Sequence, residues 1–166
     1  MAAANGDGDA VKEPAQFLDL PIMHPPVGDG NEWTVEQEWI SPPLDGQCVA
    51  IRAGFVTDGA SIPQAAWSIV GSPMEVPLLG PALCHDALYA GELVPNHTTA
   101  DWMLLRYMTM TDMNWLHRNA VWSAVRLFGG LVWSRHTAAS IAASRNMCQL
   151  VPVGQAPVWP VIPEGA

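Results

Sequence analysis

All β-rich stretches of this 166-residue chain precede its helical stretches. The turn-forming sequence Ser41–Gly46 separates residues 32–40 from residues 47–53, which predicts a β-hairpin. Helices are predicted over residues 64–70, 81–90, about 98–111 with a cap at Thr98 or Thr99, 113–128, and, after a break at Gly129 and Gly130, up to about 147. This order indicates an α+β fold, in which a small N-terminal antiparallel sheet packs on a C-terminal bundle of three to four helices.

The chain length predicts one domain, and 49% hydrophobic residues are enough to give it a buried core. Residues 1–16 are small, polar and acidic, which is typical of a flexible arm. Residues 152–166 contain several prolines and no helical period, which predicts an extended tail. The single globular domain is therefore expected to cover residues 17–151.

The charge of the chain disfavours several kinds of partner. Sixteen acidic residues against seven basic ones give a net charge of −9. Sequence-independent nucleic-acid binding needs clustered basic residues, and adsorption to anionic membranes is disfavoured for the same reason, whereas cations suit such a protein. The N-terminal stretch lacks the basic and apolar segments of a signal peptide. The most apolar window, residues 120–133, is too short to cross a bilayer and is interpreted as a buried helix.

The three cysteines lie far apart in the sequence and form no CxxC pair (Cys48, Cys84 and Cys148). A reducing compartment with three thiols that act as small core hydrophobes is the simpler interpretation. This pattern gives no support to a zinc knuckle or a redox motif.

Candidate chemistry concentrates on residues 81–90. His85 and Tyr89 are four residues apart and share one helix face, while Asp86 is rotated from His85 by about 100°. A neutral imidazole can accept a proton from water if a second group fixes its tautomer. Asp101, near the start of the next helix, can fill that role if the two helices pack antiparallel. The alternative is that His85, Tyr89 and Asp101 form an ordinary packing network.

A cation site is the second candidate feature. Asp86 can bind a hard cation, and Asp58, in the loop that follows the hairpin, supplies another carboxylate. Calcium fits oxygen ligands of this kind. Zinc bound by His85, His97 and an aspartate is the weaker alternative, because no zinc motif is present. Asp58 can equally be a turn former, and Ser61 lacks the surroundings of a hydrolase nucleophile.

Four segments of the chain carry a family resemblance: Gly54–Pro63 with Trp67, Ala82–Tyr89, Ala100–Asp101 with Leu104 and Met108, and Ala124–Gly129. In this order they resemble the domain-of-unknown-function 1353 family (DUF1353) of phages and prophages, over roughly residues 30–130. The chain departs from the family pattern at His97, where the family tends to carry an arginine, and at Leu104, where it carries an aromatic residue. The resemblance implies a phage-encoded protein that is made in the host cytoplasm and that could be carried in the virion.

A shorter similarity concerns the site alone. His85-Asp86-x-x-Tyr89 followed by Asp101 is similar to the phospholipase A2 superfamily over about twenty residues. That similarity implies that His85 activates water, Asp86 binds calcium, Asp101 orients His85, and Tyr89 supports the hydrogen-bond network. The glycine-rich calcium loop and the disulfides of the secreted enzymes are missing from the sequence.

Two functions remain open after these observations. One is a metal-assisted hydrolase of a lipid ester or a cell-envelope bond, with His85, Tyr89 and Asp101 as the catalytic group and Asp86 and Asp58 as metal ligands. The other is a non-catalytic phage virion or tail-assembly protein, in which the extended arms bind neighbouring virion proteins. An inhibitor of a host defence protein also fits a small acidic chain, but no residue selects it.

Overall fold

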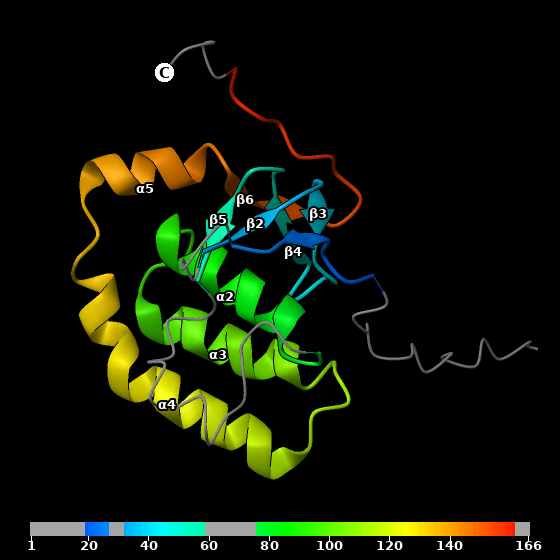
Figure 1. Ribbon diagram of the computed structural model, residues 1–166, viewed down its shortest axis with the longest axis vertical. Coiled ribbons are helices and arrows are strands. Elements are labelled where there is room, and N and C mark those ends of the chain that lie inside the picture. The colour runs from blue at the N-terminus through cyan, green and yellow to red at the C-terminus, as the bar shows by residue number, and fades with distance from the viewer. Residues whose placement is uncertain (1–18, 27–31, 59–75, 162–166) are drawn as a thin grey trace, which may run out of the picture.

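The computed structural model describes residues 19–26, 32–58 and 76–161, and it confirms the α+β prediction (Figure 1). In this part of the chain, two small antiparallel sheets lie next to the first of four helices. The second and third helices lie on the far side of the first from the sheets, and the fourth lies beside the sheets. The predicted helix over residues 64–70 and the candidate nucleophile Ser61 lie outside the described residues.

Each sheet contains three short strands. The first sheet has the order β1-β2-β5, with β1 at Met23–His24, β2 at Trp33–Val35 and β5 at Val56–Thr57. The second has the order β3-β4-β6, with β3 at Trp39–Ile40, β4 at Gln47–Ile51 and β6 at Cys148–Pro152. The predicted hairpin is confirmed as β3 and β4, because Ile40 pairs with Ala50 across the turn.

The structure corrects the predicted strand over residues 32–40, which is divided between the two sheets. Val35 and Trp39 are both buried, but the three polar residues between them (36–38) are exposed. The chain bends at these exposed residues, so β2 pairs with β1 and β5 while β3 pairs with β4. Strands β1 and β6 were not predicted, and β5 lies in a segment that was predicted to be a loop. β6 pairs with β4 over five residues, and a partner so distant in sequence leaves no local signal.

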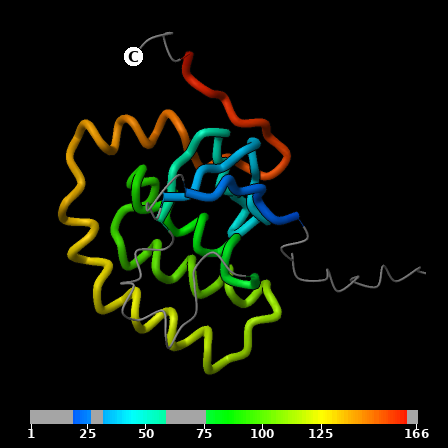
Figure 2. The backbone as a smooth tube through the Cα atoms, viewed as in Figure 1, coloured from blue at the N-terminus to red at the C-terminus, as the bar shows by residue number. Residues whose placement is uncertain are grey.

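Helix α2 (Leu79–Ala90) lies at the centre of the fold, between the sheets and α3 (His97–Met108) (Figure 2). Every residue from Gly80 to Tyr89 is buried, which explains why the helix shows no amphipathic pattern. The predicted cap of α3 at Thr98 or Thr99 is wrong, because Asn96 caps the helix. The Thr99 backbone N–H donates to the Asn96 side-chain oxygen over 2.9 Å.

Helix α4 (Trp115–Trp133) packs against α3, and α5 (Ala138–Arg145) follows after a short turn. The predicted break at Gly129 and Gly130 is wrong, because α4 runs through both glycines. The interpretation of residues 120–133 as a buried helix is also wrong for one face. Val121, Val125 and Gly129 are buried, while the opposite side of α4 faces solvent. Within the described residues, no helix is long and apolar enough to cross a membrane.

The cysteines and the C-terminal segment complete the packing around the sheets. Cys48, Cys84 and Cys148 are buried free thiols, as predicted. Residues 153–161 have no regular secondary structure, and Trp159 packs on the second sheet, where its indole N–H donates to Glu38. The described part of the tail therefore contacts its own domain, and the Pro160 carbonyl also accepts a hydrogen bond from Arg52 over 3.3 Å.

Candidate functional site

A buried carboxylate on α3 joins the residues singled out on α2. The two helices lie side by side and run in opposite directions, as the short connection between them predicts (Figure 1). His85 Nε2 lies 3.0 Å from Asp101 Oδ1, and the Tyr89 hydroxyl donates to the same oxygen over 2.6 Å. The antiparallel packing therefore brings together all three predicted members of the catalytic group.

The other oxygen of Asp101 binds residues from α4 and from the first turn of α3. Arg126 Nη1 donates to Asp101 Oδ2 over 3.0 Å and to the Thr98 hydroxyl over 2.9 Å. His97 Nδ1 lies 3.5 Å from the same carboxylate oxygen. Asp101 is thus held on both oxygens, and its orientation is fixed by three helices.

These contacts decide the charge of Asp101. Burial alone raises the pKa of a carboxyl group, but the hydrogen bonds from His85, Tyr89 and Arg126 outweigh burial, so the pKa of Asp101 lies below its ordinary value. The same surroundings raise the pKa of Tyr89, first through burial and then through its bond to Asp101. Asp101 is therefore a carboxylate and Tyr89 a neutral donor at neutral pH.

His85 is fully buried, and its two ring nitrogens have different surroundings. Burial lowers the pKa of His85, more than the neighbouring Asp101 raises it, so the ring is neutral at neutral pH. The carboxylate at Nε2 selects the tautomer that carries the proton on that nitrogen. The lone pair is then on Nδ1, which has no hydrogen-bond partner among the described residues.

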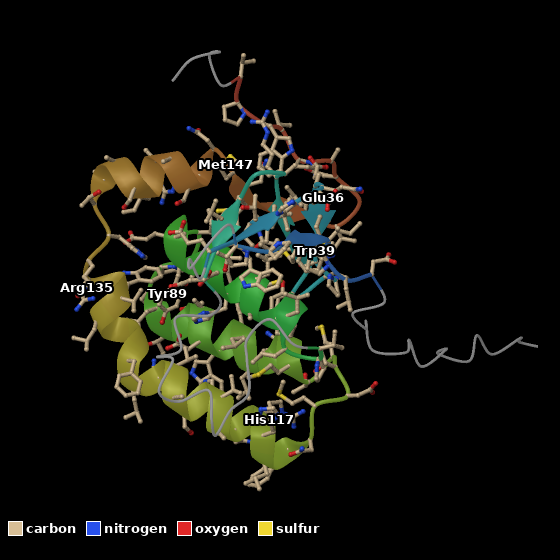
Figure 3. All side chains as sticks on the ribbon, in the orientation of Figure 1. Glu36, Trp39, Tyr89, His117, Arg135 and Met147 are labelled. Atoms are coloured by element: carbon tan, nitrogen blue, oxygen red, sulfur yellow. The ribbon has the colours of Figure 1, made fainter. Side chains whose placement is uncertain are left out.

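Gly129 lets Tyr89 reach its position. A Cβ atom added at Gly129 would overlap the Tyr89 hydroxyl oxygen, so only glycine accommodates the phenol end at this point of α4. The ring of Tyr89 also meets Trp133 edge-on, with 5.1 Å between the ring centroids. In Figure 3, Tyr89 accordingly lies at the junction of α2 with the C-terminal half of α4.

An acidic pocket of about 230 Å³ lies beside this network. Asp86, Asp58 and Glu32 line it together with His136, and the Thr57 hydroxyl donates to Asp86 Oδ2. Burial raises the pKa of Asp58, and the nearby Glu32 raises it further. The sequence placed Asp58 near Asp86, and both lie on the same pocket wall, but it gave no sign of Glu32 or His136. The pocket lining includes Tyr89 but not His85.

The donor set of the pocket favours a hard cation over zinc. Carboxylate oxygens dominate it, and calcium prefers six to eight oxygen ligands of this kind. His85 and His97, the histidines of the alternative zinc site, both lie beside Asp101 and do not line the acidic pocket. In the described part of the chain, no three His, Cys, Asp or Glu side chains gather closely enough to hold a metal ion. A cation bound by Asp86 and Asp58 would therefore keep much of its hydration.

The family described as protein of unknown function, DUF1353, matches residues 33–125, which is more than half of the chain. The chain belongs to this family. The match spans strands β2 to β5, α2, α3 and the first half of α4, and so includes His85, Asp86 and Asp101. No curated protein and no solved structure matches the chain.

In this DUF1353 protein, two residues that complete the Asp101 network lie just after residues 33–125, the part that matches the family. Arg126 and Gly129 belong to a segment whose resemblance to the family suggested no role for either residue. At His97 this chain lacks the arginine that the family tends to carry. Arg126 nevertheless supplies a guanidinium to Asp101 from α4. An arginine in the middle of the most apolar window of the chain was the signal that could have identified a buried acidic partner.

Proposed function

We propose that this DUF1353 protein is a hydrolase in which His85 is the general base. The supporting observation is that Nδ1 of the fully buried His85 has no hydrogen-bond partner among the residues that the structure describes. An unsatisfied buried polar atom costs roughly 1–3 kcal/mol, and a purely structural network would be expected to satisfy it. A base that must accept a proton needs such a free lone pair.

The other members of the network suit supporting roles. Asp101 holds the His85 tautomer and stabilises the imidazolium that forms when Nδ1 takes a proton from water. Tyr89 and Arg126 position Asp101 through its two oxygens. The hydroxide made in this way attacks an ester or amide carbonyl, and the leaving group recovers the proton from His85. General base catalysis of this kind contributes roughly 10²- to 10⁴-fold to the rate.

Asp86 and Asp58 would hold a hard cation, with calcium preferred, in the acidic pocket. Such a cation would supply electrostatic stabilisation of negative charge that develops on a substrate oxygen. The substrate class that we propose is a lipid ester or a cell-envelope bond, in keeping with a phage-encoded protein. Because the raised pKa of Asp58 favours its protonated form, cation affinity should increase with pH as Asp58 ionises.

The first experiment measures hydrolysis of short-chain and long-chain lipid esters with and without calcium. His85→Gln should lower the rate at least 10²-fold while keeping a hydrogen-bond donor near Asp101. His24→Gln is the matched control, because the His24 side chain is exposed and its ring nitrogen Nδ1 lies 3.1 Å from the adjacent Pro25 carbonyl oxygen. Equal rates for these two variants would exclude His85 as the base.

The cation site has its own test, which needs no substrate. Calorimetry should detect calcium binding to the intact protein and a loss of that binding in Asp86→Asn, with zinc binding weaker in both. Asp45→Asn is a suitable control, because Asp45 pairs with Arg106 and does not line the pocket. Absence of calcium binding to the intact protein would remove the metal-assisted step while leaving the His85 proposal to the rate measurement.

A virion or tail-assembly role is the second candidate, favoured by one observation. Val158 and Val161 are exposed in the extended C-terminal segment, where they could contact a neighbouring subunit of a phage particle. Truncation after Gln155 should then abolish incorporation into particles without changing hydrolysis. Normal incorporation of the truncated chain would count against the arm as a binding element.

A further inference from the structure

A second histidine–carboxylate pair lies at the acidic pocket, outside the Asp101 network. His136 is in the turn between α4 and α5, and it lines the pocket (Figure 1). Its Nδ1 atom lies 3.6 Å from Oε1 of Glu92, which follows the C-terminal end of α2. The His136 side chain is 17% exposed and that of Glu92 is 28% exposed. Unlike His85, His136 therefore belongs to the wall that a ligand in the pocket would contact.

The backbone at Glu92 is strained, and α5 holds it in place. Glu92 has a φ of 42°, in the left-handed region that glycine usually occupies after a helix. Arg145 of α5 donates through Nε to the Gly91 carbonyl over 2.7 Å and through Nη2 to the Glu92 carbonyl over 3.1 Å. Strained residues that their surroundings hold in place cluster at functional sites. Glycine would fit this backbone without strain, but it would leave His136 without a carboxylate.

The two ring nitrogens of His136 have different surroundings. Nδ1 is buried and has no hydrogen-bond partner among the described residues. Glu92 is too far from it for a hydrogen bond but close enough for an ion pair, and contacts of this kind often tighten when a substrate binds. A protonated His136 that directs Nδ1–H at Glu92 presents its second proton, on Nε2, to the pocket.

A row of aromatic rings separates His136 from His85. The ring centroids are 6.0 Å apart between His136 and Trp133, 5.1 Å between Trp133 and Tyr89, and 4.2 Å between Tyr89 and His85. Trp133 cannot pass a proton along this row, because its indole is a donor only. The two histidines are therefore separate acid–base groups, and hydrolysis needs two such groups: one activates water and the other protonates the leaving group.

We propose that His136 is the general acid of the hydrolysis and that Glu92 is its positioning residue. The inference rests on the proposed hydrolase function, in which the proton taken up by His85 must reach the leaving group. Hydroxide attacks the carbonyl carbon, the bond from that carbon to the leaving oxygen breaks, and the electron pair stays on the oxygen. This oxygen takes the Nε2 proton of His136. The proton held by His85 then passes through solvent to His136, which restores both residues.

This role selects a class of substrate. An alkoxide is a poor leaving group, so an ester of an aliphatic alcohol needs a proton at the leaving oxygen. A nitrophenolate leaves without one. A general acid at His136 is therefore of use for alkyl esters, and the glycerol esters of lipids are the members of this class that agree with the proposed substrate.

The test compares a glyceryl ester and a nitrophenyl ester of the same fatty acid. His136→Gln should lower kcat/KM on the order of 10²-fold for the glyceryl ester and at most about threefold for the nitrophenyl ester. Glu92→Gln should show the same pattern at about tenfold, because it acts through His136. His85→Gln should lower kcat/KM for both esters. Glu36→Gln is the control for Glu92→Gln, because Glu36 is exposed and does not line the pocket.

The outcomes separate this inference from the proposed function. A fall for the glyceryl ester alone, in His136→Gln or in Glu92→Gln if the former does not fold, supports the inference. An equal fall for both esters, or no fall for either, overturns it, while the response of His85→Gln still decides the role of that residue. Absence of hydrolysis of both esters by the intact protein overturns the proposed function and this inference with it.

Discussion

Replacing Gly129 by alanine tests whether α4 positions Tyr89 in the Asp101 network. The added methyl group would overlap the Tyr89 hydroxyl oxygen, which donates to Asp101 over 2.6 Å. Displacing that hydroxyl removes a hydrogen bond to a charged group, which costs roughly 1.5–3 kcal/mol. Overpacking adds about 1 kcal/mol, and the better helix propensity of alanine returns about the same amount. Gly129→Ala should therefore lower the free energy of unfolding by about 2 kcal/mol.

Gly130→Ala is the matched control for this substitution. A Cβ atom at Gly130 would lie 3.6 Å from His97 Nε2, an ordinary contact distance. This variant should be up to about 1 kcal/mol more stable than the wild type, because only helix propensity changes. Urea unfolding followed by far-ultraviolet circular dichroism measures both variants under the same conditions.

A double-mutant cycle with Tyr89→Phe separates the clash from other effects. Without the hydroxyl, the atom of residue 89 nearest to the new methyl group is the ring carbon Cζ at 3.2 Å, a tight contact that a small shift relieves. In the Tyr89→Phe background, Gly129→Ala should cost less than about 1 kcal/mol, which gives a coupling energy of about 1–2 kcal/mol. Equal stability of Gly129→Ala and Gly130→Ala in the wild-type background would refute the close contact between α4 and Tyr89.

Two further predictions concern the charges around Asp101. Arg126→Met should lower the free energy of unfolding by about 1–2 kcal/mol, because it removes the ion pair with Asp101. The loss is modest because Arg126 is one-third exposed and the ion pair is partly screened by solvent. Acid unfolding of this variant should begin at a higher pH. An unchanged acid midpoint in that variant would show that Arg126 does not hold the pKa of Asp101 down. Burial lowers the pKa of His85, so below its ordinary value of 6.5 the unfolded chain binds a proton that the folded protein does not. The free energy of unfolding should fall as pH drops below about 6.5, and His85→Gln should flatten that fall; identical pH profiles in urea unfolding would contradict it.

The sequence predicted the parts of the fold that depend on local pattern. The turn Ser41–Gly46 joins β3 to β4, and Pro81 lies in the first turn of α2. The sequence did not predict which strands pair over long distances along the chain. β6 pairs with a strand about one hundred residues earlier, and the split of residues 32–40 follows from which partner each half finds. Gly129 and Gly130 were interpreted as a break in the helix because glycine has a low helix propensity. Propensity does not show that Tyr89 of α2 needs a glycine at position 129.

In the candidate site, too, the contacts that depend on local pattern were predicted and the long-range contacts were not. His85, Tyr89 and Asp101 were predicted from helical spacing and a short connection, and the structure brings them together. Arg126, from the third of these helices, was not assigned to Asp101, because that contact depends on how α4 crosses α3. Glu32 and His136 were missed for a similar reason, since they reach the acidic pocket from two loops that are about one hundred residues apart in the sequence.

Burial, together with the charge balance around Asp101, explains how a buried histidine can stay neutral beside a carboxylate. A lone buried carboxylate would favour a proton on His85, and the pair would then be a structural ion pair with no base. Arg126 supplies the compensating positive charge on the other oxygen, and Tyr89 adds a neutral donor. Burial lowers the pKa of His85 more than Asp101 raises it, so Nδ1 stays unprotonated in a fully buried position. On this reasoning Arg126, although it lies outside the helices that carry the His85 and Asp101 motif, helps to keep Asp101 a carboxylate, and Asp101 in turn selects the tautomer of His85.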